Sequence, residues 1–304
     1  MRVFVTGATG FIGSAIVQEL IGAGHQVLGL ARSDASANAL TAAGAEVHRG
    51  DLEDLDSLRS GAAASDGVIH AGFIHDFTRF PEVCEVDRLA IAAIGEVLAG
   101  SDRPFIVTSG TALVSPGKLA TEDIIPSFHP EFPRASEQAA DAAAALGVRT
   151  SVIRLSPSVH GDGDLHGFVP MLINIAREKG ISAYIADGRN RWNAVHRLDA
   201  ARLYRLAIEN TAQATENTAQ AARFHSVAEK EIAFKEIAEA IGRNLGIPVV
   251  SKTQEEAAEH FGWFAGFATI DCPASGKLTQ ERLDWRPTHS TLLTDMDGKV
   301  YFKS

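Results

Sequence analysis

The glycine spacing near the start of the chain constrains the fold more than any other feature. Residues 2–6, RVFVT, are apolar or β-branched and predict a buried parallel strand. Gly7, Gly10 and Gly13 follow at once, and residues 14–21 then have the apolar spacing of a helix. A glycine-rich turn between strand and helix lets backbone N–H groups and the helix dipole bind a pyrophosphate. A tight turn without a ligand is the alternative, and the spacing is G-x-x-G-x-x-G instead of G-x-G-x-x-G, but the strand–turn–helix context favours binding.

Strands and helices alternate along the first half of the chain. We expect further strands at residues 26–30, 46–49, 67–71, 104–108 and 150–155, and helices at residues 35–43, 54–64, 81–98 and 133–146. This alternation predicts an α/β fold with a doubly wound parallel sheet of the Rossmann type, covered by helices on both faces.

Beyond residue 155 the alternation loosens. Helices are expected at residues 168–178, 199–208, 234–245 and 255–267, with Asp199 as an N-cap, and strands at residues 183–185, 224–227 and 249–252. We predict a dinucleotide-binding domain of residues 1–156 plus 192–228, to whose sheet the strand at residues 224–227 returns. A smaller C-terminal substrate lobe would comprise residues 157–191 plus 229–304.

Composition and charge exclude several functional classes. A net charge of −10 leaves no basic face for nucleic acid or an anionic membrane. No apolar run approaches the roughly 18 residues of a membrane span, and a strand that begins at residue 2 leaves no room for a signal peptide. Cys84 and Cys272 lack disulfide or zinc spacing and are read as reduced thiols. These features predict a cytoplasmic protein.

Several segments resemble one enzyme superfamily. TGATGFIG at residues 6–13 is similar to the start of extended and atypical short-chain dehydrogenases/reductases, the NAD-dependent epimerase/dehydratase superfamily. The similarity continues in GDL at residues 50–52, IHAG at 69–72, VTSG at 107–110, RLSPSVHG at 154–161 and NAVHRLDAARLY at 193–204. The resemblance implies a nicotinamide cofactor and, as in many relatives, a possible homodimer formed through the helices at residues 81–98 and 133–146.

The end of the second strand bears on which dinucleotide is bound. NAD-binding relatives carry an acidic residue there, whereas this chain has Arg32 and Ser33, which suit the 2′-phosphate of NADP. We therefore expect NADP over NAD, although Arg32 read as a solvated surface charge, or Asp34 at a shifted strand end, would weaken that expectation. The predicted cofactor contacts are Gly7, Thr9, Gly10, Phe11, Ile12, Gly13, Arg32, Ser33, Asp51, Leu52, His70, Ala71, Gly72, Phe73, Thr108, Pro157, Ser158 and Val159. For His70, a buried histidine bonded to backbone is an equal alternative.

The usual catalytic pair of this superfamily is missing. Relatives use Tyr-x-x-x-Lys, in which the lysine lowers the tyrosine pKa and holds the nicotinamide ribose, together with a nearby serine or threonine. Here Pro133 stands at the tyrosine position and Glu137 at the lysine position. The hydroxyl position falls near Gly110, and Ser109 and Thr111 on either side are the candidates to replace it.

Other side chains are candidates for the missing acid–base and substrate roles. His129 and His160 are the predicted proton donors, although a structural hydrogen bond is the commoner role for a histidine. Tyr184, Arg191, Trp192 and His196 are the predicted substrate contacts. Residues 160–166 mix histidine and aspartate but lack a defined ligand set, so no metal is expected.

Two functions remain open. The first is an NAD(P)-dependent oxidoreductase that acts on a carbonyl or hydroxyl of a small organic substrate by a non-standard acid–base arrangement. The second is a non-catalytic NAD(P)-binding redox sensor or regulatory protein, which the missing tyrosine and lysine favour. The predicted polar loop and lobe junction favour the enzyme.

Overall fold

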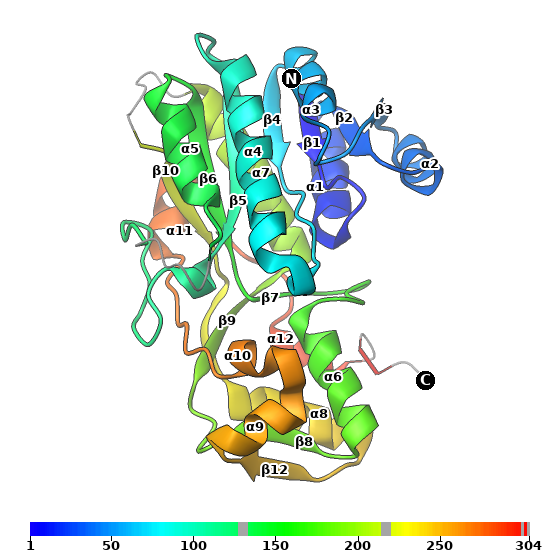
Figure 1. Cartoon of the computed structure of the whole chain (residues 1–304), viewed down its shortest axis with the longest axis vertical. Helices are drawn as coiled ribbons and strands as arrows, with labels where there is room; N and C mark the ends of the chain where they lie inside the picture. Colours follow the sequence, from blue (N-terminus) through cyan, green and yellow to red (C-terminus); the bar gives the residue numbers. More distant parts are fainter. Residues whose placement is uncertain (127–132, 214–219, 299–300, 303–304) are drawn as a thin grey trace.

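A parallel sheet forms the centre of the larger domain in the computed structural model, which describes residues 1–126, 133–213, 220–298 and 301–302 (Figure 1). Its seven strands are β1 (Arg2–Thr6), β2 (Gln26–Ala31), β3 (Glu46–Arg49), β4 (Gly67–His70), β5 (Pro104–Gly110), β6 (Arg149–Leu155) and β10 (Ala222–Ser226). They lie in the order β10-β6-β5-β4-β1-β2-β3, and all their pairings are parallel. The strand order reverses between β1 and β4, where such sheets bind ligands at their carboxyl edge.

Helices cover both faces of this sheet. Successive strand residues point to opposite faces, and the central strands carry apolar side chains on both. α1 (Phe11–Gly22), α2 (Asp34–Ala42) and α7 (Arg197–Gln213) cover one face, and their buried side chains share a core with Val3, Val5, Ile106 and Ile153. α3 (Leu55–Ala63), α4 (Phe80–Leu98) and α5 (Ser136–Ala145) cover the other face, with Phe4, Val68, Val107 and Val152. The doubly wound Rossmann-type fold is therefore confirmed.

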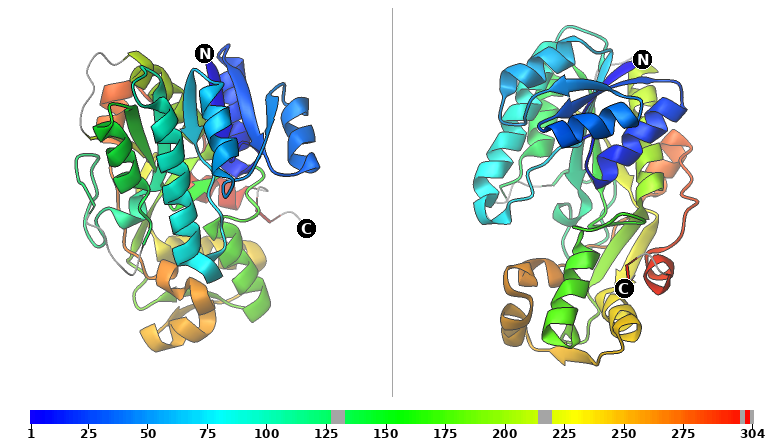
Figure 2. Two further views of the ribbon diagram at one scale, coloured as in Figure 1. Left: turned by 45° about the horizontal axis from the view of Figure 1, so that its top comes forward. Right: turned by 90° about the vertical axis from the view of Figure 1, so that its right-hand side faces the viewer.

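A smaller lobe lies beyond the carboxyl edge of the sheet (Figures 1 and 2). It contains a three-stranded sheet of β11 (Glu229–Ala233), β9 (Arg191–His196) and β7 (Ser158–His160), and a two-stranded sheet of β12 (Val249–Lys252) and β8 (Ser182–Ile185). Its helices are α6 (Phe168–Lys179), α8 (Phe234–Leu245), α9 (Gln254–Phe261), α10 (Ala265–Ala268) and α12 (Leu292–Asp297). Within the described residues, no helix has both the length and the apolar character that a membrane span requires.

Two predicted helix boundaries are wrong. The helix expected at residues 255–267 breaks at Gly262, whose φ of +56° suits glycine, into α9, a 3-10 turn (Gly262–Phe264) and α10. Asp199 is not an N-cap, because α7 already begins at Arg197. The Asp199 carboxylate instead accepts the backbone N–H groups of Thr288 and His289, each at 3.0 Å, and so holds the C-terminal segment to the start of α7.

The chain crosses between the two units more often than the sequence predicted. The strand at residues 224–227 does return to the main sheet, as β10. However, β9 belongs to the lobe sheet although it lies largely in the range given to the larger domain. Residues of α11 (Lys277–Leu283) and Trp285 pack into the core that contains β1 and α7, so part of residues 229–304 covers the larger domain.

Candidate active site

The glycine turn packs so closely against neighbouring backbone that it has no room for side chains at Gly7 and Gly13. Gly7 has φ +66°, and a Cβ there would lie 2.7 Å from Gly72 Cα. A Cβ on Gly13 would lie 1.9 Å from the Gly7 carbonyl oxygen. Gly10 is the N-cap of α1 and offers no side-chain cap, so the first N–H groups of the helix face outward from the turn. These residues fit the pyrophosphate of a dinucleotide.

A cation lies close to this turn and was not predicted. The Arg197 guanidinium lies 4.7 Å from the centre of the Phe11 ring and donates to Ser14 Oγ at 3.0 Å. Its other hydrogen bond goes to the Asp162 carbonyl, in the loop after β7. The sequence hid this contact because Arg197 follows Phe11 by more than 180 positions.

The predicted adenosine end lies at the carboxyl ends of β2 and β3. Arg32 is 78% exposed, and its Nε lies 3.6 Å from Asp51 Oδ2. Ser33 caps α2, accepting the Ser36 N–H at 3.2 Å. Asp34 forms an exposed ion pair with Arg49, so the carboxylate that could favour NAD is already paired. A cation and a hydroxyl therefore follow β2 in sequence, the first beside Asp51 and the second against Ser36.

The His70 ring is bonded within the protein, as in the alternative of a buried histidine, but its partners are side chains instead of backbone. It is buried, its Nδ1 bonds Thr6 Oγ1 at 2.9 Å, and its Nε2 donates to Asp87 Oδ1 at 3.2 Å. Thr6 Oγ1 also accepts the Gly72 N–H, and Ser136 Oγ donates to Asp87 Oδ2. Burial opposes the ionisation of Asp87, but these hydrogen bonds and the charge of Arg134 outweigh it, so its pKa is lowered. A chain of hydrogen bonds therefore joins the glycine turn to the start of α5.

Arg134 and His75 are the polar side chains that sequence reasoning missed at this edge. The Arg134 guanidinium lies 4.4 Å from the centre of the Phe73 ring, and Nη2 donates to the Thr108 carbonyl at 3.3 Å. The His75 ring meets Phe73 edge to face at 5.4 Å. Burial, and then the charge of Arg134, lower the pKa of His75. His75 follows β4 and Arg134 precedes α5, and these positions in the sequence could have indicated that both lie at the carboxyl edge of the sheet.

The candidate hydroxyls after β5 differ in how they are engaged. Thr111 is buried and lies within hydrogen-bond distance of the Leu155 carbonyl and Asn193 Oδ1. The predicted cofactor contact Thr108 donates to the His70 carbonyl at 2.8 Å and accepts from the buried Tyr204 hydroxyl at 2.7 Å. Ser109 lies on the α4–α5 face of β5, and within the described residues its hydroxyl makes no hydrogen bond. Ser109 is therefore the hydroxyl left available for a ligand.

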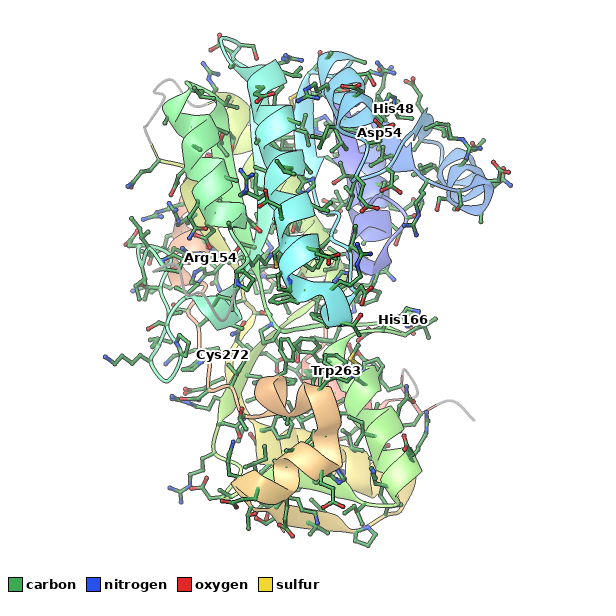
Figure 3. The ribbon with its side chains drawn as sticks, in the orientation of Figure 1. His48, Asp54, Arg154, His166, Trp263 and Cys272 are labelled. Atoms are coloured by element: carbon green, nitrogen blue, oxygen red, sulfur yellow. The ribbon has the colours of Figure 1, made fainter. Side chains whose placement is uncertain are left out.

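Glu137, which the sequence predicts at the lysine position, is part of the protein interior. It bonds Arg154 of β6 through both oxygens at 2.8 Å and Arg223 of β10 at 2.9 Å. Burial opposes its ionisation, but the two arginines outweigh burial and lower the pKa of Glu137. Figure 3 shows Arg154 between α5 and the α11 side of the molecule. Glu137 is a structural residue.

Of the two predicted proton donors, the structure describes His160, which is bonded within the protein. His160 is buried, its Nδ1 bonds Asp295 Oδ2 at 2.6 Å, and its Nε2 is buried without a hydrogen-bond partner among the described residues. His196 lies edge to face with His160 at 5.4 Å and stacks on His289 at 4.7 Å. These histidines hold the C-terminal segment against β7 and β9. His129 lies outside the described residues.

The predicted substrate contacts are dispersed. Tyr184 lies on β8, at the far end of the lobe, under the Lys235 ammonium group. Arg191 is bidentate to Asp271 and also pairs with Glu231. Trp192 is 1% exposed in the lobe core, so it cannot line an open substrate site. The prediction for Trp192 is wrong because strand position alone does not tell a core face from a ligand face.

An aromatic bridge instead joins the larger domain to the lobe. We define it as Phe73, His75, Phe77, Trp263 and Phe267. Phe77, just before α4, stacks on Trp263 at 5.1 Å and meets Phe267 at 5.6 Å. Trp263 is 58% exposed, and Figure 3 shows it between the start of α4 and α10.

The remaining predicted contacts lie near the turn or behind it. Ala71 and Leu52 lie against Gly7 and Gly72, and Ile12 and Val159 pack partly buried against the core of β1 and α7. Pro157 is half-buried, and Ser158 Oγ is buried without a described partner. Thr9 Oγ1 lies 3.5 Å from Ser36 Oγ. In residues 160–166, Asp164 accepts from Tyr301 and Gly167, and His166 is exposed.

A doubly wound sheet with an uncapped glycine turn at its first helix defines the class of dinucleotide-binding α/β proteins. Within that class, the chain belongs to the NAD dependent epimerase/dehydratase family, whose model matches residues 3–220. The family resemblance expected from the sequence is confirmed.

Relatives and solved structures cover nearly the whole chain. The uncharacterized protein C2A9.02 of Schizosaccharomyces pombe is 53% identical over 99% of this chain and 100% of its own length. YLL056C of Saccharomyces cerevisiae, also described as uncharacterized, is 46% identical over 97% of this chain and 98% of its own length. UDP-glucose-4-epimerase from Stenotrophomonas maltophila, solved with bound NAD, has a TM-score of 0.76 at 17% identity and covers 99% of this chain and 97% of its own. At that identity the likeness shows the fold alone.

Proposed function

We propose that the protein is an NADP-dependent oxidoreductase that transfers hydride between its cofactor and a carbonyl or hydroxyl group of a small, apolar organic substrate. The observation that carries the proposal is the pairing, at one edge of the sheet, of an uncapped glycine turn with the unbonded hydroxyl of Ser109. The structural neighbour solved with NAD supports a nicotinamide cofactor.

The residues present would divide the work of holding the cofactor. Gly7, Gly10 and Gly13 would hold the pyrophosphate, and Arg32 with Ser33 the 2′-phosphate. When bound, the nicotinamide supplies or accepts the hydride. Ser109 would hold the substrate oxygen by a hydrogen bond, which orients the carbonyl carbon.

The aromatic bridge supports an apolar substrate. Phe77 and Trp263 stack on each other, and His75 links Phe77 to Phe73, which directly follows Gly72 beyond the end of β4. Arg191, the cation predicted to bind substrate, is neutralised by Asp271 and Glu231 and so favours no phosphate-bearing ligand. An aromatic or aliphatic ketone or aldehyde fits these surroundings better than a nucleotide sugar.

One observation favours the second candidate, a non-catalytic dinucleotide-binding regulator. Glu137 stands at the family's lysine position and is locked in structural ion pairs, so the ordinary acid–base pair has no direct substitute there. A panel of aromatic and aliphatic ketones and aldehydes with NADPH decides between the candidates. Consumption of NADPH supports the enzyme, whereas binding of NADPH without turnover of any panel member supports the regulator.

The cofactor is tested by calorimetric titration of NADPH and NADH into the wild type and Arg32→Glu. We expect the wild type to bind NADPH at least tenfold more tightly than NADH, because a charge-assisted hydrogen bond contributes about 1.5–3 kcal/mol. Arg32→Glu should lose most of that preference with NADH affinity little changed. Arg59→Glu, an exposed change on α3, is the matched control. Tighter NADH in the wild type would overturn the NADP assignment, and no binding of either would overturn the proposed function.

A further inference from the structure

Arg134 leaves part of its guanidinium unbonded, unlike Arg103 and Arg154 of the larger domain. Its Nε donates to Ser136 Oγ at 3.0 Å and its Nη2 to the Thr108 carbonyl at 3.3 Å. Its Nη1 has no hydrogen-bond partner among the described residues. Arg103 and Arg154, which brace loops and strands, use all three nitrogens. Arg134 therefore keeps donors that no described residue uses.

The guanidinium is held in place by a buried carboxylate that it does not touch directly. Asp87 is 3% exposed and accepts from His70 Nε2 and Ser136 Oγ, and Ser136 in turn accepts from Arg134 Nε. The Phe73 ring covers one face of the guanidinium at 4.4 Å. A cation fixed on one side and one face, with its outer N–H groups unbonded, is arranged to receive an acceptor.

The position of Arg134 selects which part of a dinucleotide supplies that acceptor. In a sheet of this order the cofactor crosses the switch point between β1 and β4, with its pyrophosphate at the glycine turn and one nucleotide over each half of the sheet. The adenosine half faces β2 and β3, where Arg32 and Ser33 lie. Arg134 contacts the residues that follow β4 and end β5, on the opposite half.

We infer that Arg134 binds the nicotinamide riboside half of the cofactor through its Nη1 donors. Ribose hydroxyls and the carboxamide oxygen are the acceptors of that half, and a guanidinium N–H suits both. The inference rests on the proposed function, because it requires the dinucleotide, and it assigns a role to a residue outside the Tyr-x-x-x-Lys positions.

Fragment binding tests this assignment without any substrate. NADPH and 2′,5′-ADP, which lacks the nicotinamide riboside, are titrated by calorimetry into the wild type, Arg134→Ala and Arg134→Lys. We expect Arg134→Ala to weaken NADPH about tenfold or more while 2′,5′-ADP binds within about twofold of the wild type. Arg134→Lys, which keeps the charge, should recover part of the NADPH affinity. Arg88→Ala, at an exposed α4 arginine that pairs with Glu85, is the control and should change neither.

Three results would overturn the assignment. Equal weakening of NADPH and 2′,5′-ADP by Arg134→Ala, together with a lowered Tm, would make Arg134 a structural brace. Unchanged NADPH affinity in Arg134→Ala would leave the proposed cofactor in place and remove Arg134 from its site. A wild type that binds neither ligand would overturn the proposed function and this inference together, so the two failures are distinguishable.

Discussion

At the scale of single residues, function at the sheet edge depends on which polar groups the protein has already satisfied. His70, Thr108 and Thr111 have the residue types of a ligand site, yet each bonds other parts of the chain. Ser109 and Arg134 retain unbonded donors among the described residues. A buried polar group is costly to leave unpaired, so an available donor at this edge is a stronger indication of binding than its residue type.

His160 gives a residue-scale prediction about pH. Burial lowers its pKa below the ordinary value, although Asp295 at 2.6 Å acts in the opposite direction. The other titratable groups that face it are Glu229, 3.9 Å from Nε2, His196, and Asp199, whose charge also raises the pKa of His160. The unfolded chain takes up a proton on His160 near pH 6.5, whereas the folded chain does so only at lower pH. The contribution of neutral His160 to the free energy of unfolding is therefore present above pH 6.5 and is lost as the pH falls below that value.

We expect His160→Asn, which keeps an N–H donor toward Asp295, to show a smaller loss of Tm than the wild type between about pH 7 and pH 5. Each unit of pKa depression is worth about 1.4 kcal/mol, or roughly 2–4 °C in Tm for a chain of this size. Thermal unfolding across that range measures it. His166→Asn, at an exposed site, is the control. A His160→Asn profile parallel to the wild type would show that His160 does not contribute.

At the scale of elements, the β1–α1 turn joins fold and function in one piece of backbone. Gly13 packs on the Gly7 carbonyl, and Gly7 packs on Ala71 and Gly72 after β4. The turn therefore holds β1, α1 and the end of β4 together, while no side chain caps the first N–H groups of α1. α4 and α5 also pack closely at a glycine, because Gly95 of α4 allows Ala143 of α5 to approach.

Two glycines of α1 distinguish the close packing of the turn from the ordinary helix preference for alanine over glycine. Gly13→Ala would place a Cβ 1.9 Å from the Gly7 oxygen, so we expect a loss of about 1–3 kcal/mol in the free energy of unfolding and of most NADPH affinity. Gly22→Ala, at the other end of α1, meets no atom within 4 Å and should stabilise by about 0.5–1 kcal/mol with unchanged binding. Urea unfolding and calorimetry measure both. Normal NADPH binding by a folded Gly13→Ala would contradict the assignment of the turn.

At the scale of the whole molecule, the aromatic bridge is where the lobe meets the larger domain at the sheet edge. It joins residues 73–77 to residues 263–267, so it exists only once both units are folded.

Leu89 and Leu146, on α4 and beside α5, are 38% and 60% exposed. We expect that face to form the homodimer contact, which sedimentation of the wild type and Leu146→Glu tests.

Trp263 gives the corresponding prediction about substrate. With an active carbonyl from the panel, Trp263→Ala should raise KM for aromatic ketones about 2–10-fold, because a stacked aromatic pair is worth about 0.5–1.5 kcal/mol. KM for aliphatic ketones and the Tm should change little, since Trp263 is 58% exposed. Trp263→Phe should retain most of the aromatic preference. An equal rise for both substrate types would place Trp263 outside the substrate contacts.

The sequence by itself determined the fold of the larger domain. Apolar periodicity and turn chemistry are local, so residues 2–13 and the strands that follow could be placed within one or two positions, and the match to residues 3–220 confirms the family. The lobe strands β7, β9 and β11 were missed because short, mixed-polarity strands form only when distant partners pair.

Only the tertiary structure decided which polar side chains are free. His160 meets Asp295 across 135 positions and Thr108 meets Tyr204 across 96, and no local pattern records such pairs. Contacts between distant residues also place Trp192 in the lobe core and Arg134 on the Phe73 ring at the sheet edge. Hydrogen bonding and burial are properties of neighbours in space, so the roles of these residues followed from packing.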